Sequence, residues 1–282
     1  MIADAARKIG GYVNGKGTAW SDSGRLRQLS LSVLGLVLFL AAWEGITIIA
    51  ALNPKYFPGP FLVYEELARI WEPLLLVLPN TLTAAGVGFV AALVLSIVVA
   101  IPIVANERLG SAVMPFIVGM NTVPRIAVAP LAIYWVDLVG FLELDAANYI
   151  MALWVAFFPM LVAAIDGFRS IDEATENMLT IYGARTWQEF RYVRLQAGFP
   201  FIFDGMKLGV VLAMIGAVIG EFISSTLGIG AMAKSAIGRT AVNRAIAIVL
   251  VLGVVSFAVI LLIYLIESRV VHWRESSMIA GE

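Results

Sequence analysis

Few residues in this 282-residue sequence have the types and spacing that catalysis or metal binding requires. The stretch GGYVNGKGT, residues 10–18, approaches the phosphate-binding loop pattern, with Gly10, Gly15 and Lys16 at matching positions. Gly17 stands where a serine or threonine would bind magnesium, and the sequence predicts neither a strand before the stretch nor a helix directly after it. We therefore expect a polar tail here and no ATP binding by this chain.

The other catalytic constellations are incomplete. The paired glutamates of EELAR, residues 65–69, resemble those of intramembrane proteases, but their amphipathic surroundings favour a solvated helix face. The chain has one histidine, His272, and no cysteine, so it offers no His- or Cys-based metal site and no supported catalytic triad. The sequence thus predicts no enzymatic activity, no metal site and no cofactor in this chain. A net charge of −1 gives no reason to expect a nucleic-acid partner.

Charged side chains inside apolar segments form a second group of candidates, since burying a charge in lipid is costly and usually functional. Glu44, Arg125 and Glu221 lie well inside such segments, whereas Lys207 lies near an end and can reach the aqueous surface. Arg125 is flanked by prolines in NTVPRIAVAPL, which would leave backbone groups and a basic side chain available to an anionic substrate. The alternative is a structural ion pair of Arg125 with Glu44 or Glu221.

Small residues recur every three or four positions in the apolar segment 199–223. Gly205, Gly209, Gly216 and Gly220 would let two helix backbones approach closely. The pattern predicts a packed helix but leaves open whether its neighbour is a helix of the same chain, a second subunit or a substrate pathway. The candidate substrate-pathway residues are therefore Glu44, Arg125, Gly209, Gly216 and Glu221.

The composition indicates the solvent that surrounds these residues. Hydrophobic residues make up 61% of the chain and charged residues 14%, with a mean hydropathy of +0.92. Soluble domains are about half apolar and about a quarter charged, so lipid must cover the surplus apolar surface. Each apolar segment is long enough to cross a hydrocarbon core about 30 Å thick. The sequence predicts an all-α integral membrane protein with six spans, at 31–52, 80–105, 112–136, 146–167, 199–223 and 245–266.

The distribution of charge orients these spans. Most of the 19 lysines and arginines fall on the cytoplasmic side if both chain ends are inside, which predicts an N-in, C-in arrangement. Pro115, Pro124 and Pro130 are expected to kink or break the third span. The predicted organisation is a cytoplasmic tail (1–30), a first span (31–52), an outside loop with an interfacial helix (53–79), a five-span core (80–267) that includes a cytoplasmic loop (170–196), and a cytoplasmic tail (268–282).

The cytoplasmic loop contains two patterns typical of helix starts. Ser170 with Glu173 predicts a capped helix that ends near Gly183, and Thr186 with Glu189 predicts a second capped helix. Aromatic side chains and arginines alternate in the second helix. Exposed aromatic residues beside arginines are typical of protein docking sites. We therefore expect a compact pair of short helices that binds a partner.

Several motifs, in this order along the chain, carry a resemblance to a known family. They are FPGPFLVYEEL (57–67), NTVPRIAVAPLAIYW (121–135), GARTWQEFRYVRL (183–195), FPFIFDGMKLGV (199–210) and GEFISSTLGIGAMAKSA (220–236). Together they resemble the permease subunits of ABC importers, the binding-protein-dependent inner-membrane components, in the nitrate, sulfonate, taurine and thiamine-precursor branch. The resemblance extends from about residue 57 to the C-terminus.

This resemblance implies a type I importer fold in a bacterial or archaeal plasma membrane, and alternating access of a small polar or anionic nutrient. The implied partners are a second permease copy, two cytoplasmic ABC ATPase subunits that bind ATP and magnesium, and an extracytoplasmic substrate-binding protein. The implied coupling residues are Glu173, Glu176, Asn177, Gly183, Ala184, Arg185, Trp187, Phe190 and Arg191.

The chain departs from the family pattern at two positions of the cytoplasmic loop. Asn177 stands where the family has a glutamate, and Gln196 stands where it has a proline; Glu176 is the alternative glutamate. Two other functions compete with the permease reading: an ion-coupled secondary transporter, and a membrane-embedded scaffold or enzyme. The first would use embedded carboxylates, and the second would need the catalytic constellation that the sequence lacks.

Overall fold

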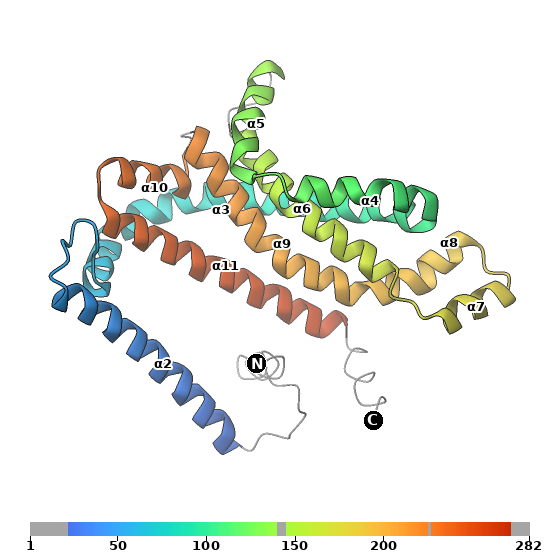
Figure 1. Ribbon diagram of the computed structural model, residues 1–282, viewed down its shortest axis with the longest axis horizontal. Coiled ribbons are helices and arrows are strands. Elements are labelled where there is room, and N and C mark those ends of the chain that lie inside the picture. The colour runs from blue at the N-terminus through green and yellow to red at the C-terminus, as the bar shows by residue number, and fades with distance from the viewer. Residues whose placement is uncertain (1–21, 140–144, 225–226, 272–282) are drawn as a thin grey trace. The chain divides into compact units, whose positions relative to one another are not determined.

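The computed structural model describes residues 22–139, 145–224 and 227–271, and every regular element in these ranges is a helix (Figure 1). The stretch at 10–18 and His272 lie outside the described residues. The helices are α2 (Asp22–Ile49), α3 (Pro60–Ala105), α4 (Glu107–Asn121), α5 (Arg125–Val139), α6 (Ala146–Phe168), α7 (Glu173–Ile181), α8 (Thr186–Glu189), the π-helical η1 (Phe190–Arg194), α9 (Leu195–Ser224), α10 (Ile229–Gly238) and α11 (Val242–Val270). The predicted all-α fold is confirmed.

The apolar helices agree with the predicted number of spans. Within the described residues, five helical stretches are long and apolar enough to cross a membrane, and the bent pair α4–α5 makes a sixth if it counts as one span. The five stretches are Ser30–Ile49, Pro60–Ala105, Ala146–Phe168, Thr186–Ser224 and Val242–Val270.

The third span is broken, as its prolines predict. The axes of α4 and α5 differ by 96°. Pro124 lies in the short gap between them, where the proline ring disfavours a helical residue before it. Pro115 and Pro130 lie inside α4 and α5 without ending them. Only one of the three prolines therefore marks a helix end.

Two predicted boundaries differ from the helix ends. The helix α2 begins at Asp22, within the predicted tail 1–30. The predicted interfacial helix and the second span are one 46-residue helix, α3, which continues through residue 80. Pro60 is its first residue, a position that needs no backbone N–H donor.

The described residues fall into two compact units. The first unit holds residues 22–75 and 233–251. The second holds residues 76–139, 145–224, 227–232 and 252–271. In the first unit, the carboxylate of Glu66 is buried and accepts a hydrogen bond of 2.6 Å from Nε of Arg244. The expectation that the EELAR glutamates are solvated is therefore wrong for Glu66, because a buried carboxylate needs a charged or hydrogen-bonding partner.

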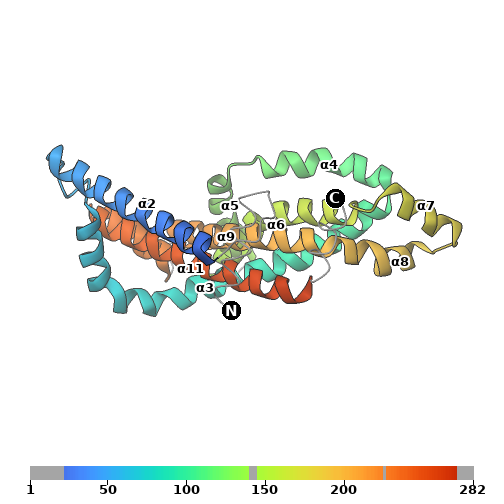
Figure 2. The same ribbon diagram turned by 90° about the horizontal axis from the view of Figure 1, so that it is seen from below.

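The core of the second unit is the contact between α6 and α9, which lie side by side in Figures 1 and 2. The glycines of α9 face α6. A Cβ atom on Gly205 would lie 2.8 Å from Ala163 Cβ, one on Gly216 would lie 2.8 Å from Ala152 Cα, and one on Gly209 would lie 2.7 Å from Met160 Cγ. Distances below 3 Å leave no room for a side chain.

These contacts answer the question that the small-residue pattern left open. Gly209 and Gly216 are buried against a helix of the same chain, so neither lines a substrate pathway in this conformation. Within lipid no hydrophobic force drives helices together, and close van der Waals contact between small residues takes its place. Gly209 and Gly216 are thus packing residues, and their predicted place on a substrate pathway is wrong for this conformation.

Replacing Gly216 by alanine is expected to destabilise the protein by about 1–3 kcal/mol, because its Cβ meets backbone atoms of α6 that cannot rotate away. Thermal unfolding in detergent, followed by tryptophan fluorescence, measures the change. Gly86→Ala is the control, since a Cβ on Gly86 of α3 meets nothing within 4 Å. Equal melting temperatures for the two variants would contradict the close α6–α9 contact.

Candidate coupling segment between α6 and α9

The polar segment between α6 and α9 begins with a short helix that ends at a glycine. In α7, the amide of Ala184 donates to the carbonyl oxygen of Leu179, and the amide of Gly183 donates to that of Thr180. Gly183 has a φ of +65°, a region where a Cβ atom is strained. The predicted helix end at Gly183 is confirmed, and α7 is a separate short helix.

The second half of the segment is not a separate helix. From Thr186 to Ser224 the chain is helical over 39 residues, through α8, η1 and α9 without interruption. Pro200 lies inside this helix. The predicted pair of short helices is therefore wrong in its second member, which is the end of the fifth span extended beyond the apolar region.

Both predicted capping patterns are also shifted. The Ser170 hydroxyl donates to the carbonyl oxygen of Gly167 at 2.7 Å, and α7 begins at Glu173 with Asp172 before it. In α8, the side-chain oxygen of Gln188 accepts a bond of 2.9 Å from the amide of Arg185. Thr186 is thus the first helical residue and not the cap. The residue before each helix is also polar, Asp172 for α7 and Arg185 for α8, and the capping pattern did not distinguish it from the predicted cap.

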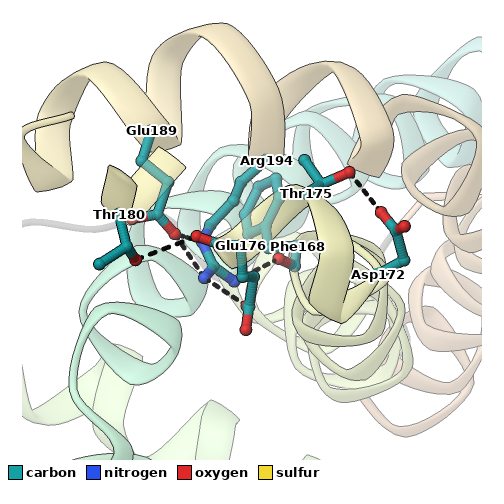
Figure 3. A network of polar contacts seen from close by, with 7 residues as sticks. All are labelled: Phe168, Asp172, Thr175, Glu176, Thr180, Glu189 and Arg194. Carbon is teal, nitrogen blue, oxygen red and sulfur yellow. Dashed lines mark hydrogen bonds and ion pairs between the residues drawn. The ribbon is translucent and has the colours of Figure 1, made fainter. Parts of the chain in front are cut away.

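One arginine holds the segment together (Figure 3). Nη1 of Arg194 donates to the carbonyl oxygen of Phe168 at 3.1 Å, and Nη2 donates to Oε1 of Glu176 at 2.8 Å. Both Nε and Nη2 lie 2.5 Å from Oε1 of Glu189. We call these four residues the Arg194 cluster. It joins the end of α6, the middle of α7 and the α8–η1 helix.

The sequence did not reveal this cluster. Glu189 and Arg194 are five residues apart, whereas an α-helix brings together residues three or four apart. The π-helical hydrogen bonding of η1 runs from each residue to the fifth, and this wider turn places the two charges together. Glu176, which we expected to face a partner, is instead paired with Arg194 within the chain.

Phe190 is a structural residue. Its side chain is only 8% exposed and packs edge-on against Phe168, with ring centroids 4.9 Å apart. The expectation that Phe190 presents an aromatic face to a partner is therefore wrong. Because the extended helix lies against the end of α6, one aromatic residue of the segment fills that contact.

Five large apolar or aromatic side chains of the segment are exposed. Ile181 is 83% exposed, Tyr182 81% and Trp187 64%, and Met178 and Tyr192 are also exposed. We call these five residues the tip surface. Of these five residues, the sequence predicted a docking role only for Trp187. The other four were not predicted, because an amphipathic helix normally buries its apolar side chains. Exposed apolar side chains gathered in one short segment are typical of a docking site.

Other predicted coupling residues lie in the same segment. Four of them are exposed: Glu173, Asn177, Arg185 and Arg191. Ala184 is half-buried.

Arg125 and Glu221, the two embedded charges of the second unit, do not form one site. Arg125 is half-buried at the first position of α5, and the described residues provide it with no hydrogen bond or ion pair. Glu221 is fully buried, and its carboxylate accepts hydrogen bonds from Thr81 and Gly230, so the expected pair of Arg125 with Glu221 is absent. Glu44 belongs to the first unit, where its carboxylate lies against Gly59.

Lys207, which was predicted to reach the aqueous surface, forms two ion pairs within the chain. Its Nζ atom lies 2.9 Å from Oδ1 of Asp204 and 2.6 Å from Oε2 of Glu267. The side chain of Glu267 is buried, so the second pair joins α9 to α11. Lys207 is thus a structural charge within the second unit.

Replacing Arg194 by glutamine is expected to release α7, since it leaves Glu176 and Glu189 without a cation while the core is untouched. Limited chymotrypsin digestion at Tyr182 and Trp187 should become several-fold faster, with an unchanged melting temperature. Arg191→Gln, at an exposed position three residues away, is the control and should not change the cleavage rate. Equal cleavage rates in both variants would show that the Arg194 cluster does not hold the segment.

Comparison with known proteins agrees with this architecture. Residues 92–272, well over half of the chain, match the family described as binding-protein-dependent transport system inner membrane component. The chain is 29% identical over 247 residues to the riboflavin transport system permease protein RibX of Chloroflexus aurantiacus, covering 86% of this chain and 89% of that protein. It is 27% identical to the formylaminopyrimidine transport permease protein ThiX of Halalkalibacterium halodurans, over 86% of this chain and 95% of that protein. It is 25% identical to the taurine transport system permease protein TauC of Escherichia coli, over 88% of this chain and 91% of that protein.

The family match and the apolar helices place the chain in the plasma membrane as a multi-pass protein. The relatives are permeases, so neither competing function is supported. The chain belongs to the inner-membrane components of binding-protein-dependent transport systems, and it is a permease subunit of an ABC importer.

Proposed function

We propose that residues 173–194 are the docking segment of an ABC ATPase subunit, and that the helix from Thr186 to Ser224 transmits the movement of the ATPase to the membrane part. The observation that carries this proposal is the continuity of that helix. Its first turns bear Trp187 of the tip surface, and its glycines lie against α6. A partner bound at one end therefore acts on the packed core without an intervening loop.

The Arg194 cluster supports the same role. It ties α7 to the helix and to the end of α6, so Ile181 and Tyr182 on the α7 side move together with Trp187. A docking site of this kind can transmit force because its parts have one arrangement. Glu173, Asn177, Arg185 and Arg191 surround the apolar residues as the polar rim of the interface.

The cycle that follows is alternating access. Two ATPase subunits bind and hydrolyse ATP with magnesium, and two copies of this chain form the pathway between them. A substrate-binding protein delivers the nutrient on the opposite side of the membrane. This arrangement requires the segment 170–196 and both tails, 1–30 and 268–282, to be cytoplasmic, with the 53–79 region outside.

The substrate is proposed to be a small molecule that carries a negative charge. The names of the relatives include neutral heterocycles, such as riboflavin, and small compounds that carry an anionic group, such as the zwitterion taurine and the anion nitrate. Arg125 favours a compound with an anionic group, because it lies at the bend between α4 and α5, half-buried and without an acidic partner among the described residues. A cation in such a place attracts an anionic group.

Trp187→Ala combined with Arg191→Glu is expected to weaken ATPase binding by at least about 30-fold, the effect of losing about 2 kcal/mol at an interface hot spot. Binding of the purified ATPase to the permease in nanodiscs measures the affinity. Trp135→Ala, which removes an exposed tryptophan of α5, is the control and should leave the affinity unchanged. Wild-type affinity in the double variant would refute docking at the tip surface.

Arg125→Gln is expected to reduce uptake of an anionic substrate by at least about tenfold, since the pathway loses its cation. Uptake of radiolabelled taurine, nitrate and methanesulfonate into cells measures the rate for each compound that the wild type imports. Arg125→Lys keeps the charge and should retain a large part of the activity. Full uptake by Arg125→Gln at equal membrane abundance would remove Arg125 from the pathway.

A further inference from the structure

The end of α9 opposite the docking segment carries a fully buried carboxylate. Glu221 is 0% exposed and lies 27 residues after Arg194, about 40 Å away along a helix. It was a candidate for the substrate pathway because of its charge. Its surroundings give it a different role.

Two side chains from different helices hold the start of α10. Oε2 of Glu221 accepts a hydrogen bond of 2.8 Å from the amide of Gly230. The hydroxyl of Thr81, on α3, donates to the same Oε2 atom at 3.0 Å and accepts from the amide of Ile229 at 3.0 Å. The first two amides of α10, which have no partner within their own helix, are thus both bound by α3 and α9. A carboxylate at a helix N-terminus also interacts favourably with the helix dipole.

Two glycines beside this contact leave the space that the Glu221 side chain occupies. A Cβ atom on Gly228 would overlap the Glu221 carboxyl group, and one on Gly230 would lie 2.9 Å from Glu221 Cβ. The sequence GIG at 228–230 therefore leaves room for one buried side chain and brings the backbone amides within hydrogen-bond distance. Oε1 of Glu221 is enclosed as well, with no hydrogen-bond partner among the described residues.

We propose that Glu221 and Thr81 are positioning residues which clamp the first turn of α10 to the middle of α3 and the end of α9 in every nucleotide state. Glu221 does not contact the substrate, because its whole side chain is enclosed by protein and Oε2 is already shared by two donors. The proposal rests on the proposed function, in that the helix moved by the ATPase at one end carries the first turn of α10 at the other.

Hydrogen exchange of the complex of permease, ATPase and binding protein in nanodiscs tests the clamp. Peptides that contain the amides of Ile229 and Gly230 are followed without nucleotide and after trapping with ATP and vanadate. Both amides should exchange slowly in both states. Thr81→Val, which removes the hydroxyl from a side chain of the same shape, should speed their exchange by about tenfold. Thr81→Ser keeps the hydroxyl and should retain the protection.

A second variant tests the clamp from the other side. Gly228→Ala displaces the Glu221 carboxyl group without removing it, so it should also speed exchange at Ile229 and Gly230, while Gly86→Ala should not. Wild-type protection in both Thr81→Val and Gly228→Ala would overturn the proposal, and so would loss of protection in the wild type after vanadate trapping. Failure of the proposed function is a separate result: the ATPase would not bind, while exchange of the permease alone still measures the clamp.

Discussion

The close approach of α6 and α9 is the interaction on which the rest of the second unit depends. It is possible only because glycines on α9 leave no Cβ atoms between the two backbones. The contact fixes the end of α6 beside the start of the long helix, where the rings of Phe168 and Phe190 pack edge to face. The proposed docking segment is therefore attached at both ends to one packed helix pair, and its position follows that pair.

A continuous helix gives this attachment its functional meaning. Since α8, η1 and α9 form one helix, the side chain of Trp187 and the buried carboxylate of Glu221 belong to the same continuous element. The Arg194 cluster adds α7 to it at one end. At the other end, the Glu221 carboxylate binds the first turn of α10. The chain thus connects the tip surface to the opposite end of the span by packing and hydrogen bonds alone.

The sequence predicted the features that depend on local chemistry. Apolar segments predicted the spans, three prolines predicted a kink or break in the third span, and Gly183 predicted a helix end. Each of these features acts locally, on the backbone or on its hydration. The continuity of the helix from Thr186 into the fifth span was missed, since Pro200, which follows a polar stretch, also fits a helix start. The burial of Phe190 and the pairing of Arg194 depend on a π-helical turn and on tertiary contacts with α6, which no pattern in the segment records.

The distance between the start and the middle of the long helix, across η1, tests its rigidity most directly. The chain has no cysteine, so cysteines at Thr186 and Leu208, both exposed, can carry two spin labels at unique positions. An uninterrupted helix places them about 33 Å apart. Labelled chains are diluted with unlabelled ones, so that each distance comes from within one chain. Double electron–electron resonance should then give one narrow distance that is unchanged when the ATPase is trapped with ATP and vanadate. A shift of several ångströms on trapping would mean that the helix bends at η1, and it would contradict transmission through one rigid element.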